Sequence, residues 1–409
     1  MAPPAFLHPF AIPAAERYTT MVRGEGATVW DAEGRAYVDA LASLWYCQVG
    51  HGRAEIADAV GDQLRTLDAF HTFERFTNGP ADALAERLVA GAPMPGARVF
   101  LTCSGSESVD TALKLARHAW VLAGQPERRV VVARHRGYHG VTYGGTTAQG
   151  LPLNKADFGP LLPDVVHVDP DDLGEVEALF AEQGERVAAV IAEPLQGAAG
   201  VFPPTAGYLK GLRALCDAHG ALLIFDEVIT GFGRLGTWWA AERVDVVPDL
   251  VTFAKGATSG YQPLGGVLVG RAVLDVLEAD PHRMLRHGFT YSGHPAACAA
   301  ALANLDVLEG EDLLGRVPHL ADRFADGLGA LVDEGLAAEV RGLGAIWGLG
   351  MVDEVDAQAV RDVMLDGGVI PRAIGDRTIA FCPPLVITDA QLDQVVEVTA
   401  GALRMVLGR

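Results

Sequence analysis

Cysteine is scarce in this chain of 409 residues, which contains only Cys47, Cys103, Cys216, Cys298 and Cys382. They are widely spaced and include no C-x-x-C pair, so the sequence predicts no zinc site or other metal site. A cysteine beside a histidine could act as a nucleophile, but buried small apolar side chains are the favoured interpretation. The pattern is typical of a reducing cytoplasm.

Positive charge and long apolar runs are also in short supply. There are 32 Lys and Arg against 52 Asp and Glu, giving a net charge of −20, which argues against nucleic acid or an anionic membrane as a partner. No run of roughly 18 apolar residues is free of charges or turn residues, so no membrane-spanning helix is expected. The first basic residue is Arg17, and Pro4, Pro9 and Pro13 break the preceding stretch, so no signal peptide is expected and the predicted location is cytoplasmic.

Short apolar runs are abundant, and 50% of the residues are hydrophobic. Seven runs are predicted to be buried strands: Arg98–Cys103, Arg129–Ala133, Val165–Val168, Ala188–Ala192, Ala221–Phe225, Leu250–Ala254 and Gly266–Val269. Most are separated by helix-length amphipathic segments, such as Ser106–Trp120. This alternation predicts an α/β fold with a mostly parallel seven-stranded sheet covered by helices on both faces.

A smaller α+β domain is expected to be built from both ends of the chain. Helical patterns at Ala297–Glu309 and Asp389–Leu407 flank a short strand-like segment, Thr378–Phe381. Near the N-terminus, Thr28–Asp39 has the pattern of a hairpin that turns at Ala32–Gly34. The predicted division is residues 1–45 joining the small domain, 46–300 forming the large domain and 301–409 completing the small domain.

Charged residues follow three of the predicted strands where each strand ends: Glu193, Asp226 with Glu227, and Lys255. In an open α/β sheet, ligands bind at the carboxyl ends of the strands. A buried charge at such a place is costly unless it is paired, so these residues predict a functional site. Taken alone, Asp226 and Lys255 could instead form a buried ion pair or mark solvated strand ends.

A glycine-containing turn, Thr102–Glu107, separates the first predicted strand from a helix. Backbone N–H groups at the helix start, with the hydroxyls of Ser104 and Ser106, would suit a phosphate. Simple capping of the helix by either serine, with Gly105 permitting the turn, is the alternative. A phosphate site, a strand-end carboxylate and a strand-end lysine are together what pyridoxal 5'-phosphate (PLP) requires.

A second glycine motif, Gly231–Gly236, matches the dinucleotide pattern G-x-G-x-x-G. The next strand ends in Ala254 and Lys255 rather than in a carboxylate that could bind a ribose. A dehydrogenase is therefore disfavoured, and these glycines are expected to let the chain turn sharply.

Five motifs give the chain a specific resemblance: Ser104–Asp110, Tyr138–Gly140, Phe225–Arg234, Ala254–Gly256 and His287–Pro295. With these motifs the sequence resembles the class-III (omega) aminotransferases, PLP enzymes of fold type I. Within that family it is similar to the amine–pyruvate and β-alanine–pyruvate branch.

The resemblance implies a cofactor role for most of the strand-end and turn residues. Lys255 would form the Schiff base with PLP and move protons, and Asp226 would pair with the pyridinium nitrogen. Desolvation is expected to lower the pKa of Lys255. Glu193 would orient Asp226 from behind.

The remaining implied cofactor contacts surround the phosphate and the ring. Gly105 and Ser106 would bind the phosphate, and Ser104 and His139 are assigned to the cofactor site by their motifs. Tyr138 and Val228 would cover the two faces of the ring, and Thr290 would reach the phosphate from a neighbouring subunit. A homodimer with shared active sites is therefore expected, and the pairing of dimers into tetramers stays open.

The implied reaction is a ping-pong transfer from a primary amine or ω-amino acid to a keto acid, with pyridoxamine 5'-phosphate formed between the two halves. Arg372 matches the family's mobile carboxylate-binding arginine. Ala198 stands where 2-oxoglutarate-dependent relatives have a glutamate, which favours pyruvate as acceptor. Trp45, Phe10 and Phe73 are expected to line the substrate pocket, although core packing would also explain the two phenylalanines.

Alternatives on the same scaffold are an aminomutase, a decarboxylase or a 2-oxoglutarate-dependent aminotransferase. A non-catalytic PLP-binding protein is the alternative from another class. S-selectivity is expected from the family alone, and the sequence does not identify the natural amine donor.

Overall fold

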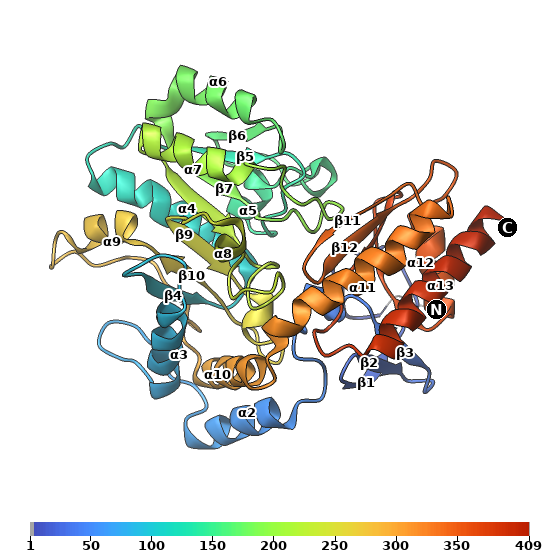
Figure 1. The fold of residues 1–409 in the computed structure, drawn as a ribbon. Helices are drawn as coiled ribbons and strands as arrows, with labels where there is room; N and C mark the ends of the chain where they lie inside the picture. Colours follow the sequence, from blue (N-terminus) through green and yellow to red (C-terminus); the bar gives the residue numbers. More distant parts are fainter. Residues whose placement is uncertain (1–3, 409) are drawn as a thin grey trace.

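The computed structural model describes residues 4–408. Figure 1 shows a larger part, built around a sheet of seven strands, beside a smaller part that contains both ends of the described chain. The smaller part is built from residues 21–39 and 313–407, which are drawn in blue and in orange to red (Figure 1).

The seven-stranded sheet has the order β4-β10-β9-β8-β7-β5-β6. Its strands are β4 (Arg98–Thr102), β5 (Val130–Arg134), β6 (Val165–Val168), β7 (Val187–Ala192), β8 (Leu222–Asp226), β9 (Leu250–Phe253) and β10 (Gly265–Val269). All seven predicted strands are confirmed. Strand β10 runs antiparallel to both of its neighbours, and the other pairs are parallel.

Helices cover both faces of this sheet, as predicted. Along β8, Leu222 and Ile224 pack in a cluster with α4 (Gly105–Leu122) and α9 (Arg271–Glu278). The alternate residues Leu223 and Phe225 pack in the cluster that includes α6 (Leu173–Gln183) and α7 (Tyr208–His219). Two-sided burial explains why the strands have continuous apolar runs instead of alternating ones. The short helices α5 (Tyr143–Ala148) and α8 (Ala240–Val244) complete this part.

Three further helices pack together beside β4. Helix α10 (Pro295–Gly310), which confirms the helix expected at Ala297–Glu309, packs on α2 (Ala54–Thr66) and α3 (Gly79–Ala90). The predicted division between residues 300 and 301 falls inside α10, and the domain limits stay a prediction.

The smaller part contains two four-stranded sheets. In the first, β1 (Met21–Glu25), β2 (Thr28–Asp31) and β3 (Ala36–Asp39) are joined by β13 (Val369–Ile370), which pairs in parallel with β3. This pairing brings both ends of the chain into one sheet, and the antiparallel pair β2–β3 confirms the predicted hairpin.

The second small sheet has the order β11-β12-β15-β14. Its strands are β11 (Glu339–Leu343), β12 (Ile346–Gly350), β14 (Arg372–Ile374) and β15 (Thr378–Phe381), the last of which was expected from the sequence. Helices α11 (Leu313–Asp333) and α12 (Ala357–Asp366) pack on the small sheets, and α13 (Asp389–Leu407) packs on these two helices. The bounds of α13 agree with the predicted helix.

All five cysteines are free, and four of them are buried. Cys47 Sγ lies 3.7 Å from His51 Nδ1, but burial raises the pKa of Cys47 to about 12. A thiol with such a pKa is not a nucleophile at neutral pH, so Cys47 behaves as a small apolar side chain. Among residues 4–408, no helix has the length and apolarity that would let it cross a membrane.

Candidate active site

A cavity of about 140 Å³ lies at the carboxyl ends of β7, β8 and β9. These strands are adjacent and parallel, so the residues that follow them meet at one edge of the sheet. Eight of the fourteen predicted site residues line this cavity: Gly105, Ser106, Tyr138, His139, Glu193, Asp226, Val228 and Lys255. Leu195 and Ile229, which the sequence did not single out, add apolar wall.

The N-terminus of α4 opens into this cavity and suits an anion. Ser104 caps the helix by accepting from Glu107 N–H at 3.2 Å, so the capping alternative is correct for Ser104, which does not line the cavity. The N–H groups of Gly105 and Ser106 belong to the first helical turn and have no intrahelical acceptor. Ser106 Oγ accepts from Val141 N–H at 3.0 Å, which leaves the hydroxyl proton of Ser106 to donate.

Two glycines keep the backbone close around this helix end. A Cβ on Gly105 would lie 2.9 Å from Val228 Cγ1, and one on Gly140 would lie 2.5 Å from Ser106 Oγ. Gly140 also has a positive φ of 92°, which side chains rarely adopt. Side chains larger than glycine at positions 105 and 140 would therefore clash with Val228 and Ser106 around the start of α4, the cup-shaped anion site (the phosphate cup).

Asp226 is the most firmly held polar group in the cavity. It is buried, its Oδ2 lies 2.7 Å from His139 Nδ1, and its Oδ1 accepts from Thr252 Oγ1 at 3.1 Å and from Val228 N–H at 3.2 Å. These donors fix the direction of the carboxylate. Thr252 was not predicted, although it is the one polar side chain in the apolar run of β9.

Glu193 does not orient Asp226 directly, contrary to the prediction. Its carboxylate accepts from Tyr138 N–H at 2.9 Å and from Gly197 N–H at 3.3 Å. His139 and Thr252 hold Asp226 instead. Desolvation raises the pKa of Glu193 to about 7 because the side chain is buried among cavity residues.

Lys255 lies at the start of a single 3-10 turn, Lys255–Ala257, with a strained φ of 40°. Within the described chain its amine forms no hydrogen bond or ion pair, so the simple ion pair with Asp226 is not formed. Desolvation lowers the pKa of Lys255, as predicted, and nearby Asp226 and Glu193 partly offset this effect. The amine is therefore placed to act as a nucleophile or base.

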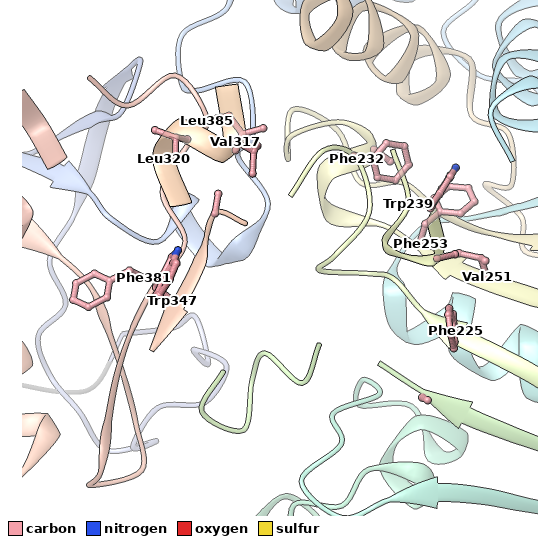
Figure 2. Packing of buried hydrophobic residues seen from close by; sticks show 14 of the residues in the cluster. Phe225, Phe232, Trp239, Val251, Phe253, Val317, Leu320, Trp347, Phe381 and Leu385 are labelled. Atoms are coloured by element: carbon pink, nitrogen blue, oxygen red, sulfur yellow. The ribbon is translucent and has the colours of Figure 1, made fainter. Parts of the chain in front are cut away.

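The glycines of the rejected dinucleotide motif form the turn predicted for them. Gly233 and Gly236 have φ values of 93° and 85°. The turn projects Phe232 onto Trp239 and Phe253, with ring centroids 5.0 and 5.7 Å away (Figure 2). Phe253 ends β9, so this aromatic cluster supports the segment that carries Lys255.

The predicted substrate residues Trp45 and Arg372 lie outside the cavity lining. Trp45 is buried in an apolar cluster with Leu195 and Ile229, behind the wall that those two form. Arg372 begins β14 and is half-buried. Burial lowers its pKa, and the nearby Tyr138 only partly offsets this effect. Among residues 4–408, the Arg372 side chain has no hydrogen-bonding or ion-pair partner.

Thr290, Phe10 and Phe73 are exposed and do not reach the cavity of their own chain. Core packing is therefore the wrong explanation for Phe10 and Phe73, which are 73% and 44% exposed. A Cβ on Gly288 would lie 3.2 Å from the Phe73 ring, so Phe73 packs beside the segment that carries Thr290. Thr72 Oγ1 also donates to Ser292 O at 2.9 Å.

Comparisons with known proteins agree with this geometry. Residues 11–403 match the family model described as aminotransferase class-III. The chain is 37% identical to a putrescine–pyruvate aminotransferase of Pseudomonas aeruginosa, over 94% of this chain and 90% of that protein. It is 38% identical to a β-alanine–pyruvate aminotransferase of the same organism, over 94% and 91%. An amine transaminase from an uncultivated Pseudomonas species, solved in its PLP-bound form, superposes with a TM-score of 0.95 at 35% identity, covering 99% of each chain.

Proposed function

The chain belongs to the class-III aminotransferases, which are PLP-dependent transaminases, and from this premise we propose that it moves an amino group from a primary amine or ω-amino acid to pyruvate in a ping-pong cycle. The observation that carries the proposal is the convergence of Lys255, Asp226 and the open end of α4 in one cavity. These residues fit PLP, because they offer an amine, a buried carboxylate and an anion cup at one place.

Bound PLP supplies an electron-withdrawing ring that stabilises negative charge on the substrate carbon. Asp226, held by His139 and Thr252, keeps a proton on the ring nitrogen. Lys255 Nζ would be the attachment point for the cofactor and would carry a proton in both half-reactions. Burial lowers the pKa of Lys255, which favours the neutral amine that these steps use.

The other lining residues hold the cofactor in place. The N–H groups of Gly105 and Ser106, with the Ser106 hydroxyl, would bind the phosphate at the positive end of α4. Tyr138 and Val228 lie in the cavity wall, where they would cover the two faces of the cofactor ring. Glu193 fixes the backbone of Tyr138 and thereby the position of its aromatic side chain.

Pyruvate as acceptor is supported by three observations. The guanidinium of Arg372 has no partner among the described residues and lies close enough to Tyr138 to offset part of the rise in pKa that burial causes at that phenol, and its planar fork suits a carboxylate. Ala198 cannot hold this arginine aside as a glutamate could. The two Pseudomonas aeruginosa relatives are both named for pyruvate.

A homodimer with shared active sites is part of the proposal. Thr290, expected to reach a neighbouring site, and Phe73, expected to line a substrate pocket, lie on adjoining exposed segments of the same chain. A second copy of the chain could receive both segments at once. The five free cysteines suit a reducing cytoplasm, which we propose as the location.

The test is a spectroscopic cycle on the PLP-loaded protein. β-Alanine, putrescine or 1-phenylethylamine is added, and loss of the visible cofactor band is followed; pyruvate or 2-oxoglutarate is then added to the amine-treated enzyme. We expect pyruvate to restore the band in the wild type. In Lys255→Ala we expect neither the loss nor the return of the band. If only 2-oxoglutarate restores the band, 2-oxoglutarate and not pyruvate is the acceptor. If no keto acid restores the band, the proposed amino transfer is wrong.

A further inference from the structure

The segment after β7 carries two cavity-lining residues, Glu193 and Leu195, and continues into a tight turn at residues 196–202. Gln196 and Phe202 close this turn with two backbone hydrogen bonds of 3.1 and 2.8 Å. Gly197, inside the turn, donates its N–H to Glu193 Oε2. The position of the 196–202 turn is therefore transmitted directly to the cavity wall.

The backbone of the 196–202 turn is strained. Val201 is fully buried and has a φ of 60°, a conformation that is rare for a β-branched residue. Gly200, beside it, has a φ of 136°. Such a conformation persists only when surrounding contacts hold it in place.

Arg341 of β11 supplies these contacts from the smaller part of the molecule. Its Nε donates to the carbonyl oxygens of Gly200 and Val201, both at 3.0 Å, and its Nη2 donates to Gly200 O at 2.8 Å. The side chain is only 12% exposed. A lysine could not reproduce this geometry, because its ammonium lacks the planar fork of donors.

The aromatic ring at the end of the turn is held by two cations. The guanidinium carbon of Arg341 lies 4.4 Å from the centroid of the Phe202 ring, and that of Arg136 lies 4.3 Å from it. Arg136 extends from the segment after β5 and forms an ion pair with Asp171. Cation–π contacts of this kind strengthen when they are partly desolvated.

Arg341 also connects the turn to the strand that carries Arg372. Its Nη2 donates to Thr378 Oγ1 at 2.8 Å, and Thr378 pairs with Ile374 across β15 and β14. Arg372 is the first residue of β14 and pairs with Ala380. One guanidinium thus joins the cavity wall of the larger part to the small sheet that presents Arg372.

We propose that Arg341 is a positioning residue for keto-acid binding, which sets the distance between the 196–202 turn and Arg372 without touching the cofactor. This inference rests on the proposed function, in which Arg372 binds the carboxylate of pyruvate. The contacts of Asp226 with His139 and Thr252, and the capping of α4 by Ser104, do not involve Arg341, so we expect the half-reaction with an amine that lacks a carboxylate to change much less than the binding of pyruvate.

The experiment compares Arg341→Lys with the wild-type holoenzyme in the two half-reactions. Because the fork is lost, the KM for pyruvate rises about tenfold, whereas the rate and KM with 1-phenylethylamine change by less than about twofold. Arg361→Lys is the matched control, because Arg361 lies on α12 and, within residues 4–408, its side chain bonds only its neighbour Asp362. Phe202→Leu, which removes the ring but keeps an apolar side chain, changes the pyruvate KM in the same direction.

Hydrogen exchange gives a readout that needs no turnover. We expect the amide hydrogens of residues 197–202 to exchange faster in Arg341→Lys than in the wild type or in Arg361→Lys. Unchanged exchange, an unchanged pyruvate KM, or equal losses in both half-reactions would overturn the inference. If Arg341→Lys does not fold, Phe202→Leu decides the same comparison. Failure of the proposed function is distinguishable from failure of this inference, because pyruvate would then not restore the cofactor band of the amine-treated wild-type enzyme.

Discussion

At the scale of single residues, Thr252 shows how much of the site depends on a side chain that carries no charge. Its hydroxyl donates to Asp226 Oδ1, opposite the His139 contact at Oδ2. A carboxylate held at both oxygens cannot rotate freely, so Asp226 would stay directed at the ring nitrogen that we propose as its partner. Thr252 is fully buried, so no solvent water can take over the hydrogen bond between its hydroxyl and Asp226.

Replacement of Thr252 by valine keeps the shape of the side chain and removes the donor. We expect the rate of the amine half-reaction to fall about tenfold, since hydrogen bonds to charged groups contribute about 1.5–3 kcal/mol. Thr252→Ser, which retains the hydroxyl, should stay close to the wild type. Stopped-flow absorbance of the cofactor band measures both rates, and equal rates in all three proteins would exclude this role.

At the scale of elements, the start of α4 provides a test of the phosphate cup. In Gly105→Ala the new Cβ would lie 2.9 Å from Val228 Cγ1, so the cup must widen. We expect the affinity for PLP to fall about tenfold, measured by fluorescence titration of the apoenzyme. Gly79→Ala, at the start of α3 with no atom within 4 Å of the added Cβ, is the control and should bind PLP normally.

The connection between β8 and α8 depends on Glu227, which is fully buried. Its carboxylate accepts from Ala240 N–H at 2.5 Å, from Ala241 N–H at 2.9 Å and from Thr230 Oγ1 at 3.1 Å. These donors favour the charged form, but desolvation is larger and raises the pKa of Glu227 from 4.5 to about 7.

The raised pKa predicts how stability depends on pH. The folded protein binds this proton more tightly than the unfolded chain, so the contribution of Glu227 to stability is complete below pH 4.5 and is lost as the pH rises through 7. The loss amounts to about 3 kcal/mol. In Glu227→Gln the thermal midpoint should therefore vary less with pH in this window, whereas Glu177→Gln, exposed on α6, should follow the wild type. Parallel curves for all three proteins would contradict the assignment.

At the scale of the whole molecule, the shared active sites that we propose predict complementation between two inactive variants. Lys255→Ala would remove the proposed attachment lysine of one site, and Thr290→Asp would place a negative charge beside the proposed phosphate position of the neighbouring site. After mixed refolding, half of the dimers contain one chain of each kind and have one intact site, so roughly a quarter of the wild-type activity should return. No recovery, or a monomer by sedimentation, would contradict the shared site.

The sequence by itself determined the seven strands of the large sheet, the order of the strand-end residues and the chemistry of the cavity. Two-sided burial requires apolar runs, and a charge that ends such a run is visible without a structure. Lys255, Asp226 and the glycine-containing turn at Gly105 could therefore be identified as candidate site residues from the sequence.

Only the tertiary structure decided which groups support these residues. Thr252 and His139 reach Asp226 from other strands and loops, and Arg341 reaches the 196–202 turn from a separate sheet. Contacts between residues that are distant in the chain depend on strand order and side-chain direction, which local patterns do not record. For the same reason the antiparallel direction of β10 and the pairing of β3 with β13 were not evident from the sequence.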